Sequence, residues 1–414
     1  MLLKILTLTT LFISYVSASW TSYGTSSWDA RDSASLLKYG DNLLMIGGVT
    51  RKLPGNIGVT STKIYNEVWS KTTDPSTSWN KVITNTNFLP KYAFASFVAN
   101  SDIDDSNPTT SIIIAGGKQF NENGTVVVGN DVWRSDNGGV DWQFVSYASW
   151  APRQAMAYCN LHGKIFVIGG AGIDEQGKEI KRTDIWSSID LGKTWQLVNS
   201  NYEFAARADF LCLTIGDDMY IAGGENNPTV FNDLWKSSDE GKTWKLVNSN
   251  CGFSKRFNHG FVTDGKNLIV FGGRISFTDP YLSDMWISDD LGKSWTPTLQ
   301  NGWDGRTDTA HIVYNNQIYM YGGRSLTQNY NDQWIFKIPQ SSDNVPVIPT
   351  NNSSNSLSDG QRTALIVSLT IVSFIAIIAL SAVLFLQRRV KLIADHIYTK
   401  APTNPNHNEV EMQV

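Results

Sequence analysis

Residues 232–249, NDLWKSSDEGKTWKLVNS, are one copy of a segment that occurs repeatedly in this chain of 414 residues. Residues 183–200 read TDIWSSIDLGKTWQLVNS, and residues 283–295 read SDMWISDDLGKSW. In each copy, two short runs containing tryptophan flank a turn with aspartate and glycine at fixed positions. Such turn residues between short strand-like runs are typical of a β-hairpin. The repetition predicts that this hairpin is the building unit of the fold.

Glycine pairs at the ends of apolar runs measure the length of the repeat. They occur at Gly47-Gly48, Gly116-Gly117, Gly169-Gly170, Gly223-Gly224, Gly272-Gly273 and Gly322-Gly323. Their spacings of 69, 53, 54, 49 and 50 residues indicate a repeat architecture. Each unit holds four short strand-like runs, which we name a to d in chain order, and no long amphipathic helix pattern. Six such units predict an all-β, six-bladed β-propeller of four-stranded blades.

The sixth unit has no strand d, because the chain passes from Trp334 into a segment rich in Pro, Ser and Asn. Trp20 stands eleven residues before Arg31, much as Trp195 stands twelve residues before Arg207. We therefore predict that residues 20–23 supply the missing strand. The ring would then close without an open sheet edge.

The glycine pair with a following tryptophan, at a period near 50, resembles kelch repeats over nearly all of residues 19–338. The c–d turn resembles the Asp-box of sialidases and related propellers, Ser-x-Asp-x-Gly-x-Thr-Trp. It is nearly complete in residues 188–195, 237–244 and 288–295 and degenerate in residues 135–142 and 72–79. The two resemblances together imply a propeller. Because unrelated functions share this fold, they imply no particular activity.

The residues of the Asp-box-like turns are predicted to be structural. A glycine can take the positive φ of a tight turn, and an aspartate can accept backbone N–H groups across it. The predicted turn residues are Asp190, Asp239, Asp290, Gly192, Gly241 and Gly292. We expect no calcium or other metal site there, since no Asp-x-Asp-x-Asp-Gly loop with a distal Glu is present.

The ends of the chain predict a single-pass membrane protein. Residues 1–18 have the layout of a secretory signal peptide, with cleavage expected after Ala18. Residues 364–386 are an uncharged apolar run that would rise about 34 Å as a helix, and Arg388 and Arg389 follow it. The prediction is a type I protein of the plasma membrane or an internal membrane. It comprises a propeller ectodomain (19–338), a stalk (339–363), a transmembrane helix (364–386) and a cytosolic tail (387–414).

Cysteine content and net charge exclude two classes of protein. Three cysteines allow at most one disulfide, so the core and not a disulfide framework must stabilise the ectodomain. A net charge of −4 without a basic block beyond the membrane flank makes nucleic acid an unexpected partner. Asn123, Asn351 and Asn352 lie in glycosylation sequons. The hydrophobic C-terminus at Val414 matches, weakly, a ligand of PDZ-type domains.

A basic residue precedes strand a in every unit and is the candidate ligand-binding group. The six are Arg31, Lys91, Arg153, Arg207, Arg256 and Arg306. They could circle the channel and hold an anionic group. Alternatively, each could pair with a neighbouring acid such as Asp32, Asp209 or Asp308, or with carbonyls of the adjacent blade. Long b–c connectors in units 1 to 3 are where we expect a protein or glycan partner.

Catalytic activity is not expected, and no cofactor or catalytic residue is predicted. Sialidases need an arginine triad, a Tyr–Glu pair and an Asp acid, and no such non-repeated cluster is found in the sequence. Galactose-oxidase-type copper sites need two His, two Tyr and a Cys, whereas His259 and His311 lie apart in the chain from Cys159 and Cys212. The predicted function is extracellular binding or adhesion. A sialidase-like or galactose-oxidase-like carbohydrate-active enzyme is the alternative.

Overall fold

The computed structural model describes residues 20–54, 61–83, 86–100, 109–121, 123–298 and 302–339. The predicted signal peptide, transmembrane segment and cytosolic tail, with all but the first residue of the stalk, lie outside these ranges. Within these ranges, no helix is long and apolar enough to cross a membrane.

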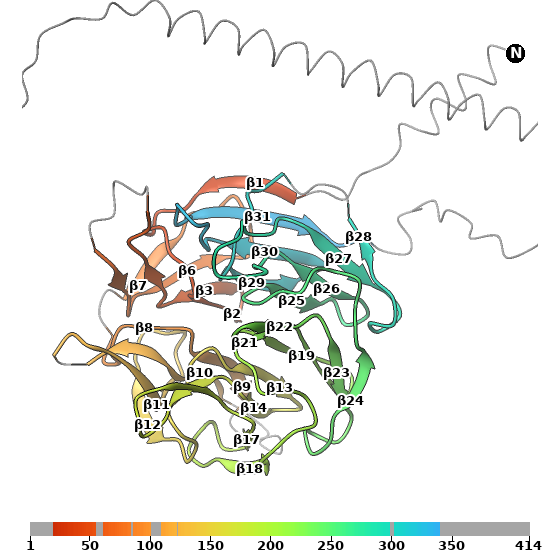
Figure 1. Ribbon diagram of the computed structural model, residues 1–414. Coiled ribbons are helices and arrows are strands. Elements are labelled where there is room, and N and C mark those ends of the chain that lie inside the picture. The colour runs from red at the N-terminus through yellow and green to blue at the C-terminus, as the bar shows by residue number, and fades with distance from the viewer. Residues whose placement is uncertain are drawn as a thin grey trace, which may run out of the picture. The chain divides into compact units, whose positions relative to one another are not determined.

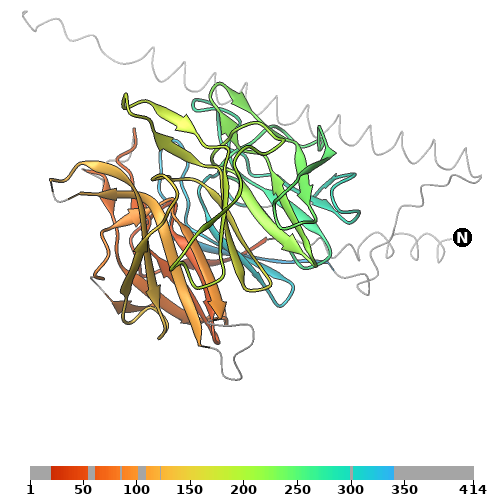
Figure 2. The same cartoon turned by 90° about the horizontal axis from the view of Figure 1, so that it is seen from below.

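Six antiparallel sheets surround a central axis, with strand a innermost and strand d outermost (Figure 1). In the view turned by 90°, the sheets of successive blades stand beside one another in chain order (Figure 2). Blades 1 to 3 contain β2 (Ser35–Tyr39), β3 (Asn42–Ile46), β6 (Val68–Thr72) and β7 (Asn80–Ile83); β8 (Lys91–Tyr92), β9 (Ala95–Asn100), β10 (Thr110–Phe120), β11 (Val126–Ser135) and β12 (Gln143–Tyr147); and β13 (Ala157–Leu161), β14 (Lys164–Ile168), β17 (Ile185–Ser188) and β18 (Gln196–Asn199).

Blades 4 to 6 repeat the arrangement. They contain β19 (Leu211–Ile215), β20 (Asp218–Ala222), β23 (Leu234–Ser237) and β24 (Lys245–Asn248); β25 (Gly260–Thr263), β26 (Leu268–Phe271), β27 (Met285–Ser288) and β28 (Thr296–Pro297); and β29 (Ala310–Tyr314), β30 (Gln317–Tyr321), β31 (Asp332–Lys337) and β1 (Trp20–Thr25). Three b–c connectors form small hairpins, β4 (Val49–Thr50) with β5 (Lys63–Ile64), β15 (Ala171–Ile173) with β16 (Glu179–Lys181), and β21 (Glu225–Asn226) with β22 (Thr229–Val230).

The N-terminal strand closes the ring, as the sequence predicted. β1 pairs antiparallel with β31, with Trp20 opposite Phe336. The Trp20 indole is buried and makes edge-on contacts with Phe271 of blade 5 and with Trp303 in the connector between blades 5 and 6. Blade 6 is thus built from both ends of the described chain.

The hydrophobic core lies between the blades. Six main clusters of buried side chains each draw on two neighbouring blades, and together they run round the ring. Between blades 2 and 3, for example, Phe97 and Ile113 pack with Ile165 and Val167. Each such fully buried side chain contributes about 1.5–3 kcal/mol relative to its exposed state.

The glycine pairs permit a close contact between successive blades. Gly169 and Gly170 have φ of 55° and 90°. The Gly170 N–H donates to the carbonyl of Arg207 in the next blade at 3.1 Å, and the equivalent bond recurs at all six blades. A Cβ on Gly170 would lie 2.7 Å from the Gln154 carbonyl oxygen. Only glycine satisfies both the positive φ and this approach.

A closed ring of backbone hydrogen bonds surrounds the axis. In each blade, the residue two places after the basic residue has a φ between 51° and 57°. Its N–H donates to the carbonyl of its counterpart in the preceding blade at 2.9–3.3 Å. The members of this neck ring are Ser33, Ala93, Ala155, Asp209, Asn258 and Asp308. The left-handed conformation is costly outside glycine, so the inter-blade bonds must hold it in place.

One disulfide joins two blades. Cys159 in β13 and Cys212 in β19 are bonded, with their Cα atoms 5.5 Å apart. Cys251 is a free, buried thiol. Burial and the nearby charge of Asp233 raise the pKa of Cys251 to about 12, so the thiol stays protonated.

Candidate functional site

The six basic residues before strand a are buried. Their exposed fractions are 0–1%, for Arg31, Lys91, Arg153, Arg207, Arg256 and Arg306 alike. Each pairs with an acid of its own blade, the residue two places before the strand c tryptophan. The pairs are Arg31–Glu67, Lys91–Asp131, Arg153–Asp184, Arg207–Asp233, Arg256–Asp284 and Arg306–Asp332.

Blade 4 shows the geometry of these pairs. Arg207 donates through Nη1 and Nη2 to the two carboxylate oxygens of Asp233 at 2.6 and 2.9 Å, and through Nη1 to the Gly223 carbonyl at 2.9 Å. The Trp235 indole N–H donates to the same carboxylate at 2.8 Å. Such a bidentate pair fastens strand a to strands b and c. The carboxylate of Asp233 is thereby occupied from two sides.

These contacts correct the sequence interpretation in two respects. The partner acids are not Asp32, Asp209 and Asp308, and the carbonyl that accepts from each side chain belongs to the residue's own blade. The reason is that strands b and c return to the base of strand a within one sheet. Because the six cations are neutralised and covered by protein, none of them is exposed to hold an external anion.

Two of the paired acids, Asp184 and Asp284, remain ionised. Burial alone would raise the pKa of Asp184, but hydrogen bonds from Arg153 and Trp186 and the charge of Arg153 hold it below its usual value. Asp284 behaves in the same way beside Arg256 and Trp286. These two ion pairs are therefore intact at neutral pH.

A polar cavity of about 200 Å³ lies instead at the mouth of the channel, on the face formed by the b–c and d–a loops. We call it the mouth cavity. Residues of all six blades line it, and many of them belong to the neck ring or directly follow a glycine pair. The charged lining residues are Arg51, Lys118, Glu179, Lys181, Asp209, Glu225, Arg274, Asp308 and Arg324.

Three of the cavity's cations form ion pairs within the protein. Arg51 binds the fully buried carboxylate of Asp32 at 2.9 Å. Arg324 lies 3.4 Å from Asp32 and 3.5 Å from Asp308. Lys181 pairs with Glu225 and with Glu179. The charges of Arg51, Arg324 and Lys181 are therefore neutralised by carboxylates in or beside the lining of the mouth cavity.

Lys118, Arg274 and Asp209 have no ion pair or side-chain hydrogen bond within the described part of the chain. Burial lowers the pKa of Lys118, which Glu179 partly offsets. Arg274 is only 9% exposed, and its guanidinium lies over the rings of Phe257 and Phe277 at 4.4 and 4.8 Å. Its Nε has no hydrogen-bond partner among the described residues. The cavity thus holds two cations without a carboxylate of their own.

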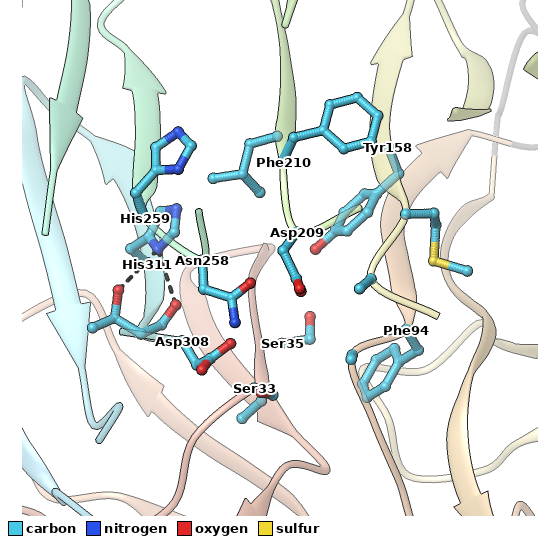
Figure 3. A pocket seen from close by; sticks show the side chains of 16 residues that line it. Ser33, Ser35, Phe94, Tyr158, Asp209, Phe210, Asn258, His259, Asp308 and His311 are labelled. Atoms are coloured by element: carbon cyan, nitrogen blue, oxygen red, sulfur yellow. Dashed lines mark hydrogen bonds between the residues drawn. The ribbon is translucent and has the colours of Figure 1, made fainter. Parts of the chain in front are cut away.

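Asp209 belongs to the neck ring and also lines a second cavity of about 120 Å³ further along the channel. In Figure 3 its carboxyl points into this space, as do the carboxamide of Asn258 and the carboxyl of Asp308. Burial, followed by the charges of Asp308 and Glu225, raises the pKa of Asp209 to about 7, against the attraction of Arg274 and Lys181. Its carboxyl can therefore hold or release a proton near neutral pH.

The two channel histidines are neutral. Burial lowers the pKa of His311 to about 4, and burial together with the charge of Arg256 lowers the pKa of His259 well below its usual value. The His311 Nδ1 contacts the Thr309 carbonyl, whereas neither nitrogen of His259 has a hydrogen-bond partner in the described part of the chain (Figure 3). Over the described ranges, no group of three or more His, Cys, Asp or Glu side chains could hold a metal ion.

The Asp-box-like turns make local hydrogen bonds. Asp190 accepts from the backbone N–H of Thr194 at 2.9 Å and from its hydroxyl at 2.6 Å, and Gly192 has a φ of 82°. The same bonds recur at Asp239 and Asp290, and Gly241 and Gly292 have φ of 82° and 91°. The Gly192 carbonyl accepts from Ser146 of the preceding blade. The turns thus help to join the blades at the rim.

The predicted glycosylation sites are only partly described. Asn123 is exposed in the connector between β10 and β11, where a glycan could be accommodated. Asn351 and Asn352 lie outside the described residues.

Comparison with known proteins supports the kelch-like fold. The KLHDC2/KLHL20/DRC7 Kelch-repeats domain matches residues 210–374, which include every strand of blades 4 to 6 except β1. The second half of the propeller therefore carries kelch repeats. No curated protein matches this sequence. Among solved structures, that of YjhT is similar with a TM-score of 0.61 and 12% identity, over 77% of this chain and 97% of YjhT. At this identity the likeness concerns the fold alone.

The sequence analysis did not recognise the mouth cavity as a site, because it searched for what the repeats share, although it named Asp209 and Asp308 as possible ion-pair partners and expected a partner at the connectors that hold Arg51 and Lys118. Lys118, Glu225, Arg274 and Arg324 all directly follow a glycine pair, where the other two blades have Val49 and Ala171. The sequence signal that could have revealed the cavity is that the residue directly after the glycine pair differs from one repeat to the next. Repeated residues support the scaffold, whereas residues that differ between blades line the cavity.

Proposed function

We propose that this chain is a type I membrane protein that presents its propeller as a binding module for an extracellular protein or glycan. The membrane attachment rests on the apolar segments 1–18 and 364–386. The binding role rests on the kelch-like propeller and, above all, on the mouth cavity. There, unpaired charged side chains from different blades converge on one face, although the repeated charges are all neutralised.

The partner is proposed to cover the mouth cavity and the adjoining connectors of blades 1 to 3. The connector hairpins β4–β5 and β15–β16 and the extended β10–β11 hairpin belong to this face. Val126 and Ile173 are exposed apolar residues on two of them. Irregular loops on a rigid scaffold are a common location for recognition.

The test is binding of a fluorescent, soluble protein comprising residues 19–339 to cells of the natural source. Saturable binding that the Ile173→Lys variant weakens, at unchanged melting temperature, supports the proposal. The Leu246→Lys variant is the matched control, since Leu246 is equally exposed but lies on outer strand β24. Absence of saturable binding by the folded protein would refute the adhesion role.

A carbohydrate-active function is the second candidate, and Asp209 is the observation that favours it. A carboxyl with a pKa of about 7 in a polar cavity is typical of groups that transfer protons. Turnover of aryl glycosides or release of sialic acid, abolished by Asp209→Asn, would establish such an activity. Its absence in the folded protein would leave the binding role.

A further inference from the structure

The two cations of the mouth cavity that make no ion pair within the described residues come from opposite sides of the channel. Lys118 belongs to blade 2 and Arg274 to blade 5, and these blades face each other across the axis of a six-bladed ring (Figure 1). Both side chains line the same cavity. A ligand on the axis therefore meets one cation on each side.

The wall around Arg274 favours an anion as the missing partner. Its guanidinium is desolvated against Phe257, Phe277 and the more distant Tyr281, and these rings accept no conventional hydrogen bond from it. A buried guanidinium without an anionic acceptor is costly, and an entering oxyanion would remove that cost. Arg324 differs, because it contacts Asp32, Asp308 and the Tyr281 hydroxyl.

Asp209 supplies a hydrogen-bond donor when it is protonated. The charged groups that line the mouth cavity with it are Asp308, Glu225, Glu179, Lys118, Lys181, Arg51, Arg274 and Arg324. The second cavity, of about 120 Å³, adds the neutral side chains of His259, His311 and Tyr158. An anion placed between Lys118 and Arg274 favours the protonated form of this carboxyl. In that form Asp209 donates to the anion instead of repelling it.

We propose that the mouth cavity binds the tetrahedral oxyanion of a phosphate or sulfate group, held between Lys118 and Arg274, with Asp209 donating a third contact. This deepens the binding role proposed above and rests on it. A tetrahedral group directs oxygens to both sides of the axis, whereas a planar carboxylate presents its two oxygens mainly in one direction. The cavity of about 200 Å³ suits a free ion or the ester group of a larger molecule.

Titration calorimetry on the purified full-length chain tests this assignment, with inorganic sulfate, inorganic phosphate and acetate as probes at constant ionic strength. We expect sulfate or phosphate to bind and acetate to bind at least tenfold more weakly. The variants Lys118→Gln and Arg274→Gln should each weaken oxyanion binding by about tenfold or more, a loss typical of one charge-assisted contact. Lys255→Gln, which removes an exposed lysine outside the cavity, should leave it unchanged.

The pH dependence gives a second readout. Oxyanion binding should strengthen as the pH falls from 8 to 6, and Asp209→Asn should bind tightly over this range with little pH dependence. Failure of sulfate and phosphate to bind the folded protein, equal binding of acetate, or unchanged binding by both cation variants would overturn the proposal.

The source of the oxyanion is distinguished by comparing the inorganic ions with a sulfated and an unsulfated form of one monosaccharide. If the sulfated sugar binds more tightly than sulfate, the ligand is an ester, and equal binding indicates the free ion. If cells bind the propeller saturably but no oxyanion binds or competes, this inference fails while the proposed binding function stands.

Discussion

Removal of one acid from a repeated ion pair should destabilise the whole propeller. In the Asp233→Ala variant, Arg207 stays buried at 1% exposure but loses two of its charge-assisted bonds. The Trp235 indole N–H loses its acceptor as well. Leaving such a cation without its partner costs about 3–5 kcal/mol. At an unfolding entropy of about 2.1 cal/mol/K per residue over roughly 320 residues, the melting temperature should fall by about 4–7 °C.

Differential scanning calorimetry of the propeller at pH 7 measures this effect. The matched control is Asp218→Ala in the same blade, which removes a carboxylate from a partly exposed pair with Lys236. Exposed pairs contribute less than about 1 kcal/mol, so this control should lose only about 1 °C. Equal melting temperatures of the two variants would show that Arg207 does not depend on Asp233, and would refute the structural role assigned to the basic residues.

Three further predictions concern ring closure, pH and the free thiol. Trp20→Ala should lower the melting temperature by about 4–7 °C, since loss of a buried tryptophan costs about 3–5 kcal/mol. The control is Tyr23→Ala, which removes an exposed side chain of the same strand, and a larger fall in melting temperature for this control would contradict closure by β1. Because the pKa of Asp209 is raised from 3.8 to about 7, the folded state takes up a proton between these pH values and its stability falls as pH rises through them. The melting temperature of Asp209→Asn should therefore fall less between pH 5 and pH 8 than that of the wild type. An equal fall in both proteins would contradict the raised pKa of Asp209. Cys251 should react with a maleimide only after denaturation, because its thiol is buried and its pKa is about 12, and rapid labelling of the native protein would show otherwise.

The repeat predicted most of the architecture because local chemistry repeats with it. The c–d turns need glycine and aspartate at fixed positions, so the hairpins were visible in the sequence. Ring closure was also predictable, since one unit lacked a strand and Trp20 stood alone at the other end. The same reasoning could not assign partners to Arg207, whose acid lies 26 residues further along the chain.

By itself, the sequence determined the number of blades, their strand order and the closing strand, because periodicity and turn residues act within about fifty residues. Only the tertiary structure decided which charges are neutralised and which are free. Charged side chains from separate blades meet at the axis, as when Arg324 of blade 6 lies 3.4 Å from Asp32 of blade 1. Whether a cation such as Arg274 lies beside a carboxylate or over aromatic rings depends on which side chains the separate blades bring to the channel, because burial and charge are properties of the assembled channel.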